Sequence, residues 1–567
     1  MRLKRTVPAL AALLLLVGAA YLFLARDERA ADPLSYLPGD TLALVDVRKP
    51  AALYATYRRS RLGKRLGAIR WDELWREFGA GAAEASASQA RVAAVQEFLA
   101  SPLFEEFFSR RAVLALLPPT VAGQDPAAFD PRESLALIAR PRHRTDVVAL
   151  LAPLLAADSR QLSEAYQGRE IRVFTLADNT VLAVAASDGL LVAAFSVALV
   201  KRCLDLGVDP ASARHRLSGN PEYQELRKRA SGQDEQFVYG DAPALARLLF
   251  RPAGVGAAAG QDAPWPLTGY RHGALFCAAD AKRLSCTAIL RNVPGKRGAA
   301  PTPAESDAEL ARLPAQLLFH FWTNLLDLPR VVAALRQDAR LRDQVSSAEF
   351  WLARKSGVPF PELWSLFGNR LSLTVAGMRG SGFFPLPRFC ACLAVQDQQR
   401  LSEALAKLLT GKEQTSRKVA GVRVNTLPLA GGLLQPSYAI SEGLLTVADS
   451  PEQLEQCLGP SATPLISTEG FRRADVGLAQ PSNMVSYTDC PRFLDGLGQL
   501  SVWAATLFAM TDQEQGKRVR AVVDRVVTPV LDGLKMYAAG SSRLTAGPTE
   551  LVLKSVLVFA GRAGKEG

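Results

Sequence analysis

Few residues in this chain combine the types and spacing that catalysis or metal binding requires. Its four histidines, His143, His215, His272 and His320, are not spaced as ligands of one metal ion. The last of them lies in a predicted strand, which favours a hydrogen-bonded core or interface position. The sequence has no G-x-S-x-G nucleophile elbow and no phosphate-binding loop. We therefore expect no metal and no cofactor, and we favour a non-enzymatic protein. Because 55 acidic residues would allow a dispersed carboxylate pair, an envelope hydrolase or transferase is the alternative.

Two aspartates lie in copies of one short pattern. The segment Tyr239-Gly-Asp-Ala-Pro243 recurs as Tyr487-Thr-Asp-Cys-Pro491. In each copy a strand ends, an aspartate can cap the next helix, and proline suits the first helical turn. This pattern favours a structural role for both aspartates. A catalytic aspartate pair is the alternative, but nothing nearby in the sequence supplies a partner base.

Two cysteines flank a predicted hairpin turn at Ala281-Lys282. In that register Cys277 and Cys286 face each other across two strands. Directly opposed residues have Cβ atoms about 4.5–5.5 Å apart, slightly farther than the ~3.5–4.5 Å typical of a disulfide. An oxidising compartment would permit the bond. A disulfide and a pair of unbonded core cysteines both remain open.

The densest basic cluster comprises Arg58, Arg59, Arg61, Lys64 and Arg65. A solvated helix face is one interpretation. Contact with anionic lipid headgroups is the other, because basic residues near a membrane surface each contribute on the order of 1 kcal/mol. The net charge of +12 is spread over 567 residues, so its density is modest and we expect no nucleic-acid partner.

A duplication organises most of the chain. Ser187-Asp-Gly-Leu190 recurs as Ser441-Glu-Gly-Leu444, and Cys203 and Cys457 each follow fourteen residues after the glycine. Short β-prone runs and Asp/Asn/Gly turns recur in the same order. The predicted strands are 41–47, 112–117, 134–139, 171–176, 180–186 and 190–195 in the first copy, and 316–321, 370–376, 388–395, 422–427, 436–440 and 444–448 in the second. We expect an α+β protein of two homologous, mainly antiparallel sheet-plus-helix domains.

The N-terminus predicts a membrane segment. Arg2, Lys4 and Arg5 precede an apolar run from Val7 to Ala25, which is near the lower length limit for a spanning helix. Basic residues ahead of the run favour a cytoplasmic N-terminus and a periplasmic bulk. We expect a single-pass inner-membrane anchor, with a cleaved signal peptide as the alternative. A second apolar run, 500–510, is too short to span and is interpreted as a buried core helix.

These patterns together predict four parts. They are a signal anchor at 1–29, a first α+β repeat at 33–294, a linker at 295–306 and a second repeat at 307–562. The linker assignment follows from its proline, glycine and charge without apolar periodicity.

The opening of the exported part resembles a known family. After a charged N-terminus and one apolar segment, Leu37-Pro-Gly-Asp-Thr-Leu-Ala-Leu-Val-Asp-Val47 is similar to the L-P-x-D-T-L-A-x-V-x-V strand of bacterial envelope proteins with a domain of unknown function. The second copy departs from it, because Leu313-Pro-Ala-Gln lacks the Asp-Thr. The resemblance implies location and fold, and brings no catalytic residues. It also implies a protein partner such as a macroglobulin-like envelope component. We therefore predict a membrane-anchored periplasmic binding or scaffold protein.

Overall fold

A computed structural model describes residues 31–118, 134–142, 160–175, 179–231, 235–243, 269–293, 302–337, 341–379, 385–459 and 461–561. The predicted anchor at 1–29, His143 and most of the predicted linker lie outside these residues. The chain divides into two compact units, Met1–Ala51 with Pro102–Glu225, and Ala52–Ser101 with Leu226–Gly567. Both units combine helices with antiparallel strands, so the α+β class is confirmed. The units do not coincide with the predicted repeats. Residues 52–101, which the prediction places in the first repeat, belong to the second unit.

The first unit is built on a seven-stranded antiparallel sheet in the order β1-β2-β3-β7-β6-β5-β4. Helix α8 packs against β6 and β7 and buries Leu199 and Cys203 completely. The strands are β1 (Ala43–Arg48), β2 (Arg111–Leu116), β3 (Leu135–Arg140), β4 (Arg160–Tyr166), β5 (Arg169–Thr175), β6 (Val181–Ser187) and β7 (Leu190–Ala194). The helices are η1 (Pro33–Tyr36), α6 (Pro102–Phe108), α8 (Val197–Val208), η4 (Pro210–His215), η5 (Leu217–Gly219) and α9 (Pro221–Arg229), which leads into the second unit.

The second unit contains one continuous antiparallel sheet in the order β8-β9-β10-β20-β19-β18-β11-β12-β13-β17-β16-β15-β14. Its strands are β8 (Gln236–Asp241), β9 (Tyr270–Ala279), β10 (Arg283–Asn292), β11 (Phe319–Thr323), β12 (Phe367–Arg379), β13 (Leu386–Val395), β14 (Thr415–Val419), β15 (Val422–Thr426), β16 (Ser437–Ser441), β17 (Leu444–Ala448), β18 (Met484–Asp489), β19 (Tyr537–Ala546) and β20 (Glu550–Phe559).

Two-residue turns that need positive φ connect β6 to β7 and β16 to β17. Asp188 and Gly189 have φ of 50° and 75°, and Glu442 and Gly443 have φ of 51° and 76°. Such turns match the right-handed twist of paired strands, and glycine occupies this conformation without a steric penalty. The turn residues therefore explain why these hairpins form at these places.

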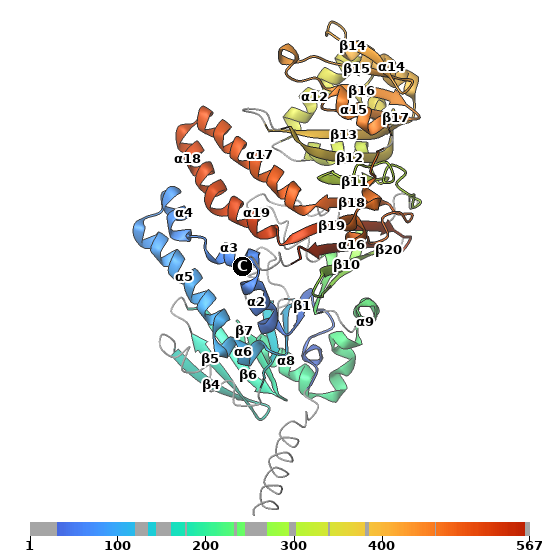
Figure 1. The fold of residues 1–567 in the computed structure, drawn as a ribbon. Coiled ribbons are helices and arrows are strands. Elements are labelled where there is room, and N and C mark those ends of the chain that lie inside the picture. The colour runs from blue at the N-terminus through green and yellow to red at the C-terminus, as the bar shows by residue number, and fades with distance from the viewer. Residues whose placement is uncertain are drawn as a thin grey trace, which may run out of the picture. The chain divides into compact units, whose positions relative to one another are not determined.

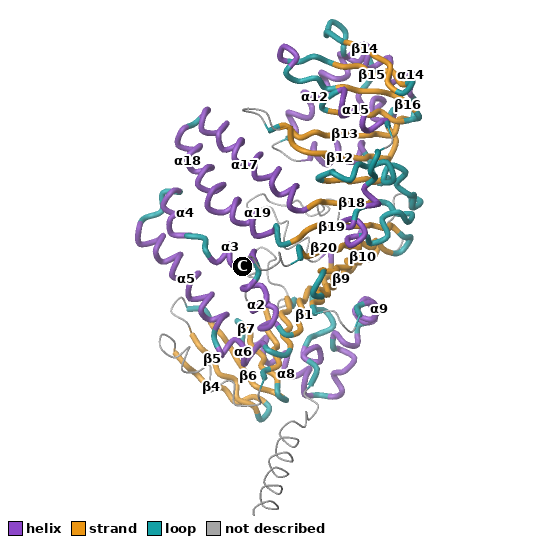
Figure 2. The backbone as a smooth tube through the Cα atoms, in the orientation of Figure 1, coloured by secondary structure: helices purple, strands orange, loops and turns teal. Residues whose placement is uncertain are grey.

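Helices of the second unit cover its sheet or project from it (Figure 1, Figure 2). One group packs about β12, β13, β16 and β17 and comprises α11 (Leu328–Gln337), α12 (Arg342–Ser356), α13 (Phe360–Ser365), α14 (Gln398–Leu408), η7 (Ala430–Gly432) and α15 (Pro451–Leu458). Helix α16 (Glu469–Ala474) packs on β19 and β20 and contacts η8 (Leu465–Ser467). A second group connects β18 to β19 and comprises α17 (Cys490–Thr511), α18 (Gln513–Val522), the π-helical turn η9 (Val523–Val527) and α19 (Thr528–Leu534). The third group, α2 (Pro50–Arg59), α3 (Arg61–Gly67), α4 (Trp71–Glu77) and α5 (Ala82–Ala100), packs on the second through α3 and α4.

Helix α17 corrects one expectation. The apolar run 500–510 is helical, but it belongs to a helix of 22 residues and is not a buried core helix. Only 17% of its most apolar stretch is buried, and Phe508 and Met510 are 49% and 67% exposed. Among the described residues, α17 is the one helix whose length and composition would allow it to cross a membrane.

Candidate functional site

A hollow lies along α17 and α19. It has a volume of about 670 Å³ and is open to solvent. Leu494, Gly498, Val502 and Thr506 face it from α17 at a spacing of four residues, which places them on one side of the helix. Leu531 of α19 forms part of the opposite wall. We call this hollow the α17–α19 groove.

The sequence explains how α17 begins at the groove. Asp489 ends β18, and its side chain accepts a hydrogen bond from the Arg492 backbone N–H at 3.2 Å. Pro491 occupies the first turn, where its missing N–H costs nothing. The structural reading of Asp489 as a helix cap is confirmed. The described residues end at Pro243, two residues beyond Asp241 in the first copy, so the helix expected there lies outside them.

Charged residues gather at one end of the groove. Lys535 Nζ lies 2.6 Å from a carboxylate oxygen of Asp495, and both residues line the groove. Arg379, at the end of β12, also lines it and lies 3.4 Å from Asp449. Burial raises the pKa of the Asp449 carboxyl above its ordinary value.

The predicted basic cluster is divided between two roles. Arg61 and Arg65 of α3 both donate hydrogen bonds to Asp532, which lines the groove on α19. Burial by itself raises the pKa of Asp532, but the two arginines outweigh it and lower that pKa below its ordinary value. Arg58, Arg59 and Lys64 are exposed. Two of the five residues therefore hold α3 against α19.

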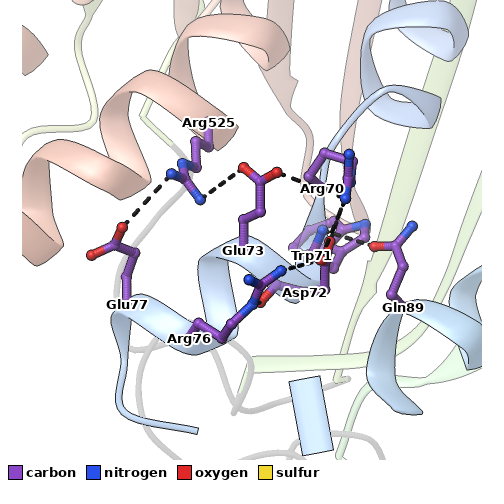
Figure 3. A network of polar contacts seen from close by, with 8 residues as sticks. All are labelled: Arg70, Trp71, Asp72, Glu73, Arg76, Glu77, Gln89 and Arg525. Carbon is purple, nitrogen blue, oxygen red and sulfur yellow. Dashed lines mark hydrogen bonds and ion pairs between the residues drawn. The ribbon is translucent and has the colours of Figure 1, made fainter. Parts of the chain in front are cut away.

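A second polar network fastens α4 to the helices that form the groove (Figure 3). Arg525, in the π-helical turn before α19, lies 3.1 Å from Glu73 and 3.7 Å from Glu77 of α4. The backbone N–H of Trp71 donates a hydrogen bond of 2.9 Å to Gln89 of α5. Exposed ion pairs of this kind contribute little singly, but a network holds its members in one arrangement. Segment 52–101 thus supports the α19 wall from outside.

A buried polar cluster lies elsewhere in the second unit. His320 Nε2 is 2.8 Å from Asp307 Oδ2, and His320 Nδ1 is 3.0 Å from Thr374 Oγ1. The side chains of His320 and Asp307 have no exposed surface. Beside them, Ser372 donates a hydrogen bond to Glu309, whose pKa is raised by burial. His320 is therefore a satisfied core histidine, and no substrate reaches the cluster without local opening.

The first unit has apolar residues at the corresponding strand positions. The second residue of β1 is Leu44, which pairs with Ala115, whereas the second residue of β11 is His320, which pairs with Thr374. On the next strand of each sheet, Ala115 pairs with Ala136 in the first unit, and Thr374 pairs with Cys390 in the second. The polar cluster is thus a property of one sheet only.

Five of the six cysteines in the second unit lie in two groups, and the sixth, Cys490, begins α17. Cys277 and Cys286 are joined by a disulfide between β9 and β10, in the directly opposed register that the sequence predicts. Cys390, Cys392 and Cys457 form part of a small apolar cluster under α15. Hydrogen bonds that the Cys390 thiol donates to the sulfurs of Cys392 and Cys457, together with burial, raise the pKa of Cys390. Within the described part of the chain, no three His, Cys, Asp or Glu residues are grouped to hold a metal ion.

Comparisons with known proteins add little. No family model matches the chain, and no curated protein sequence matches it. Crystal form I of TP0453 aligns over 48% of this chain and 82% of its own, with 11% identity and a TM-score of 0.25. Crystal form III of TP0453 aligns over 48% and 84%, with 10% identity and a TM-score of 0.26. Likeness at this level assigns neither a fold nor a function to the chain.

Proposed function

We propose that the protein is a non-enzymatic binding protein whose ligand occupies the α17–α19 groove. The observation that carries the proposal is the groove itself, an open hollow of about 670 Å³ with an apolar wall and a charged end. Ligand sites usually have volumes of about 300–1,000 Å³ and combine apolar walls with a few polar groups. Leu494, Val502, Trp503 and Leu531 supply the apolar wall.

The alternative of a hydrolase or transferase has one supporting observation. Asp307, His320 and Thr374 are hydrogen-bonded in the order that acid, base and nucleophile would require. Their burial counts against it, because His320 and Asp307 expose no side-chain surface on which a substrate could bind. A folded His320→Gln variant that loses a hydrolytic activity of the native protein would favour this alternative.

We further propose that the chain arose by internal duplication. The order β1-β2-β3-β7-β6-β5-β4 in the first unit matches the order β11-β12-β13-β17-β16-β15-β14 in the second. An irregular contact recurs as well. The N–H of Leu217 donates to the carbonyl of Leu37 at 2.8 Å, and that of Leu465 donates to Leu313 at 2.7 Å. Both carbonyls belong to the Leu-Pro pairs that open the two copies.

The proposed location is the periplasmic side of the inner membrane, with residues 1–29 as a single-pass anchor. The proposed partner is another envelope protein, such as a macroglobulin-like component, which would deliver or receive the ligand. The support is the charged and apolar order of the N-terminal residues. Fractionation of the native host, followed by protease treatment of spheroplasts, tests this location. A chain that is protected in intact spheroplasts would refute it.

The binding proposal is tested with the neutral fluorophore N-phenyl-1-naphthylamine. A Cβ at Gly498 would meet nothing nearer than Leu531 Cδ1 at 3.9 Å, so Gly498→Leu fills the groove without a clash. We expect one dye site per chain, and at least about tenfold weaker binding in Gly498→Leu, equal to ~1.4 kcal/mol. Gly67→Leu is the matched control, because a Cβ there has open space. Equal dye affinity in both variants and the native protein would refute the groove as the binding site.

A further inference from the structure

The two ends of the α17–α19 groove differ in polarity. Helices α17 and α19 run in opposite directions. Asp495 contacts Lys535, whereas Gly498, three residues later in the sequence of α17, faces Leu531, four residues before Lys535. The charged residues therefore meet at the start of α17. The far end, near Thr506, is lined by uncharged residues of both helices: Val502, Trp503, Thr506 and Thr528.

The charged end carries a positive excess. Lys535 and Arg379 each contact one carboxylate, on Asp495 and Asp449 respectively. Asp532, the second carboxylate that lines the groove, is shared by two arginines of α3. The lining itself has two cations, Arg379 and Lys535, and two carboxylates, Asp495 and Asp532. Counted with the three partners behind them, Arg61, Arg65 and Asp449, the cluster has four cations and three carboxylates. An anionic group placed there would be favoured by hydrogen bonds to charged donors, which are the stronger kind.

The groove is also long. Its α17 wall extends from Leu494 to Thr506, which at 1.5 Å per residue is about 18 Å. Gly498 lies in the middle of this wall and has no side chain to interrupt it. A long apolar slot with one cationic end matches a molecule that has one alkyl chain and one anionic head.

We propose that the α17–α19 groove binds a free, single-chain anionic amphiphile, such as a long-chain carboxylate or an alkyl phosphate. The head lies near Lys535 and Arg379, and the chain extends along α17 past Gly498 toward Thr506. The ligand enters as a monomer, because the slot is walled by two helices and a chain must leave its lipid neighbours to lie between them. This inference rests on the proposed binding function and adds the class of ligand.

The test is calorimetric titration with three amphiphiles of one chain length, below their micelle concentrations. They are dodecyl phosphate, dodecyl maltoside and dodecyltrimethylammonium. We expect dodecyl phosphate to bind at least about tenfold more tightly than the cationic probe, and this preference to weaken with added salt. In the double variant Lys535→Gln/Arg379→Gln, we expect most of the preference to disappear. The exposed Lys412→Gln and Arg58→Gln changes serve as matched controls.

The outcomes separate the two proposals. Equal affinities for all three heads, each reduced by Gly498→Leu, would overturn the anionic ligand class and leave the binding function standing. No binding of any probe, with naphthylamine binding unaffected by Gly498→Leu, would overturn both. Phosphatidylglycerol vesicles are the last arm. If they bind the native and Gly498→Leu proteins equally while dodecyl phosphate monomers do not bind, the anion recognised is a lipid surface and the monomer proposal is refuted.

Discussion

Replacing His320 by leucine tests the energetic role of the buried polar cluster. The change removes two buried contacts, 2.8 Å to Asp307 and 3.0 Å to Thr374. Leucine is the residue at the corresponding position of β1, so the apolar side chain suits a strand of this kind. Removing one partner of a buried pair costs roughly 3–5 kcal/mol, because the other partner stays buried without it. We expect His320→Leu to lower the local opening free energy of the second unit by this amount.

A second change should rescue the first. Asp307 also accepts a 2.9 Å hydrogen bond from the Glu309 backbone N–H, and asparagine keeps this bond while removing the carboxylate. We expect Asp307→Asn to cost about 1 kcal/mol alone. The double variant should cost less than His320→Leu alone, since no carboxylate is then left without its imidazole. The coupling free energy between the two positions should therefore exceed ~1 kcal/mol, the cost of Asp307→Asn alone.

The assay must report on the second unit alone. The chain has two compact units, so a single unfolding transition is not expected and one global free energy is not defined. Native-state hydrogen exchange of the β11 and β12 amides measures the local opening free energy directly. A loss below about 1 kcal/mol in His320→Leu, or a double variant whose cost is the sum of the single costs, would refute the reasoning.

Three other predictions test separate features. Burial raises the pKa of Glu309, so the native carboxyl contributes most to stability below its ordinary pKa, and this contribution is lost as pH rises through the raised pKa. Glutamine does not titrate, so the stability of the second unit in Glu309→Gln, relative to the native chain, should increase as pH rises. A pH-independent difference would contradict this. Gly533→Leu should speed hydrogen exchange in α3, because a Cβ there would lie 2.8 Å from Leu62 Cα; unchanged exchange would refute the docking of α3 on α19. Cys277→Ser/Cys286→Ser should lower the local opening free energy of the β9 and β10 amides by about 2–3 kcal/mol, the loop-closure value for a separation of 9 residues, measured by hydrogen exchange; an intact free-thiol signal from both cysteines in the native protein would contradict the bridge.

Strands next to strong turn signals were predictable from the sequence. The predicted strands 171–176, 180–186 and 190–195 correspond to β5, β6 and β7 within one or two residues at each end. Their side chains are largely apolar, and Asp188-Gly189 specifies the tight turn before β7. The predicted strands 422–427, 436–440 and 444–448 correspond to β15, β16 and β17 for the same reason.

One edge strand of each sheet was missed. β4, Arg160–Tyr166, and β14, Thr415–Val419, are mostly exposed and carry charged residues. An edge strand pairs on one side only and is protected from further pairing by charge, so it lacks the apolar alternation that reveals an inner strand. Pairing with β5 and β15 makes these segments strands.

The candidate site could be predicted only in fragments. Asp489 and Pro491 signal where α17 begins, and an apolar stretch signals that it continues. Composition does not reveal which surface an apolar helix faces, so its exposure was not foreseen. The partner side of the groove begins at Thr528, far along the chain, and no local pattern connects it to α17. The buried polar cluster could not be predicted for the same reason, because only the strand register brings Thr374 next to His320.

Photoaffinity mapping tests the central claim most directly. A dodecyl phosphate with a diazirine near the end of its chain is bound to the full-length protein, irradiated, and the labelled peptides are identified by mass spectrometry. Binding in the groove predicts label on α17 around Val502 to Thr506 and on α19 near Thr528, with loss of both in Gly498→Leu. Label spread over the exposed apolar side chains of other helices, unchanged in Gly498→Leu, would contradict the groove as the binding site.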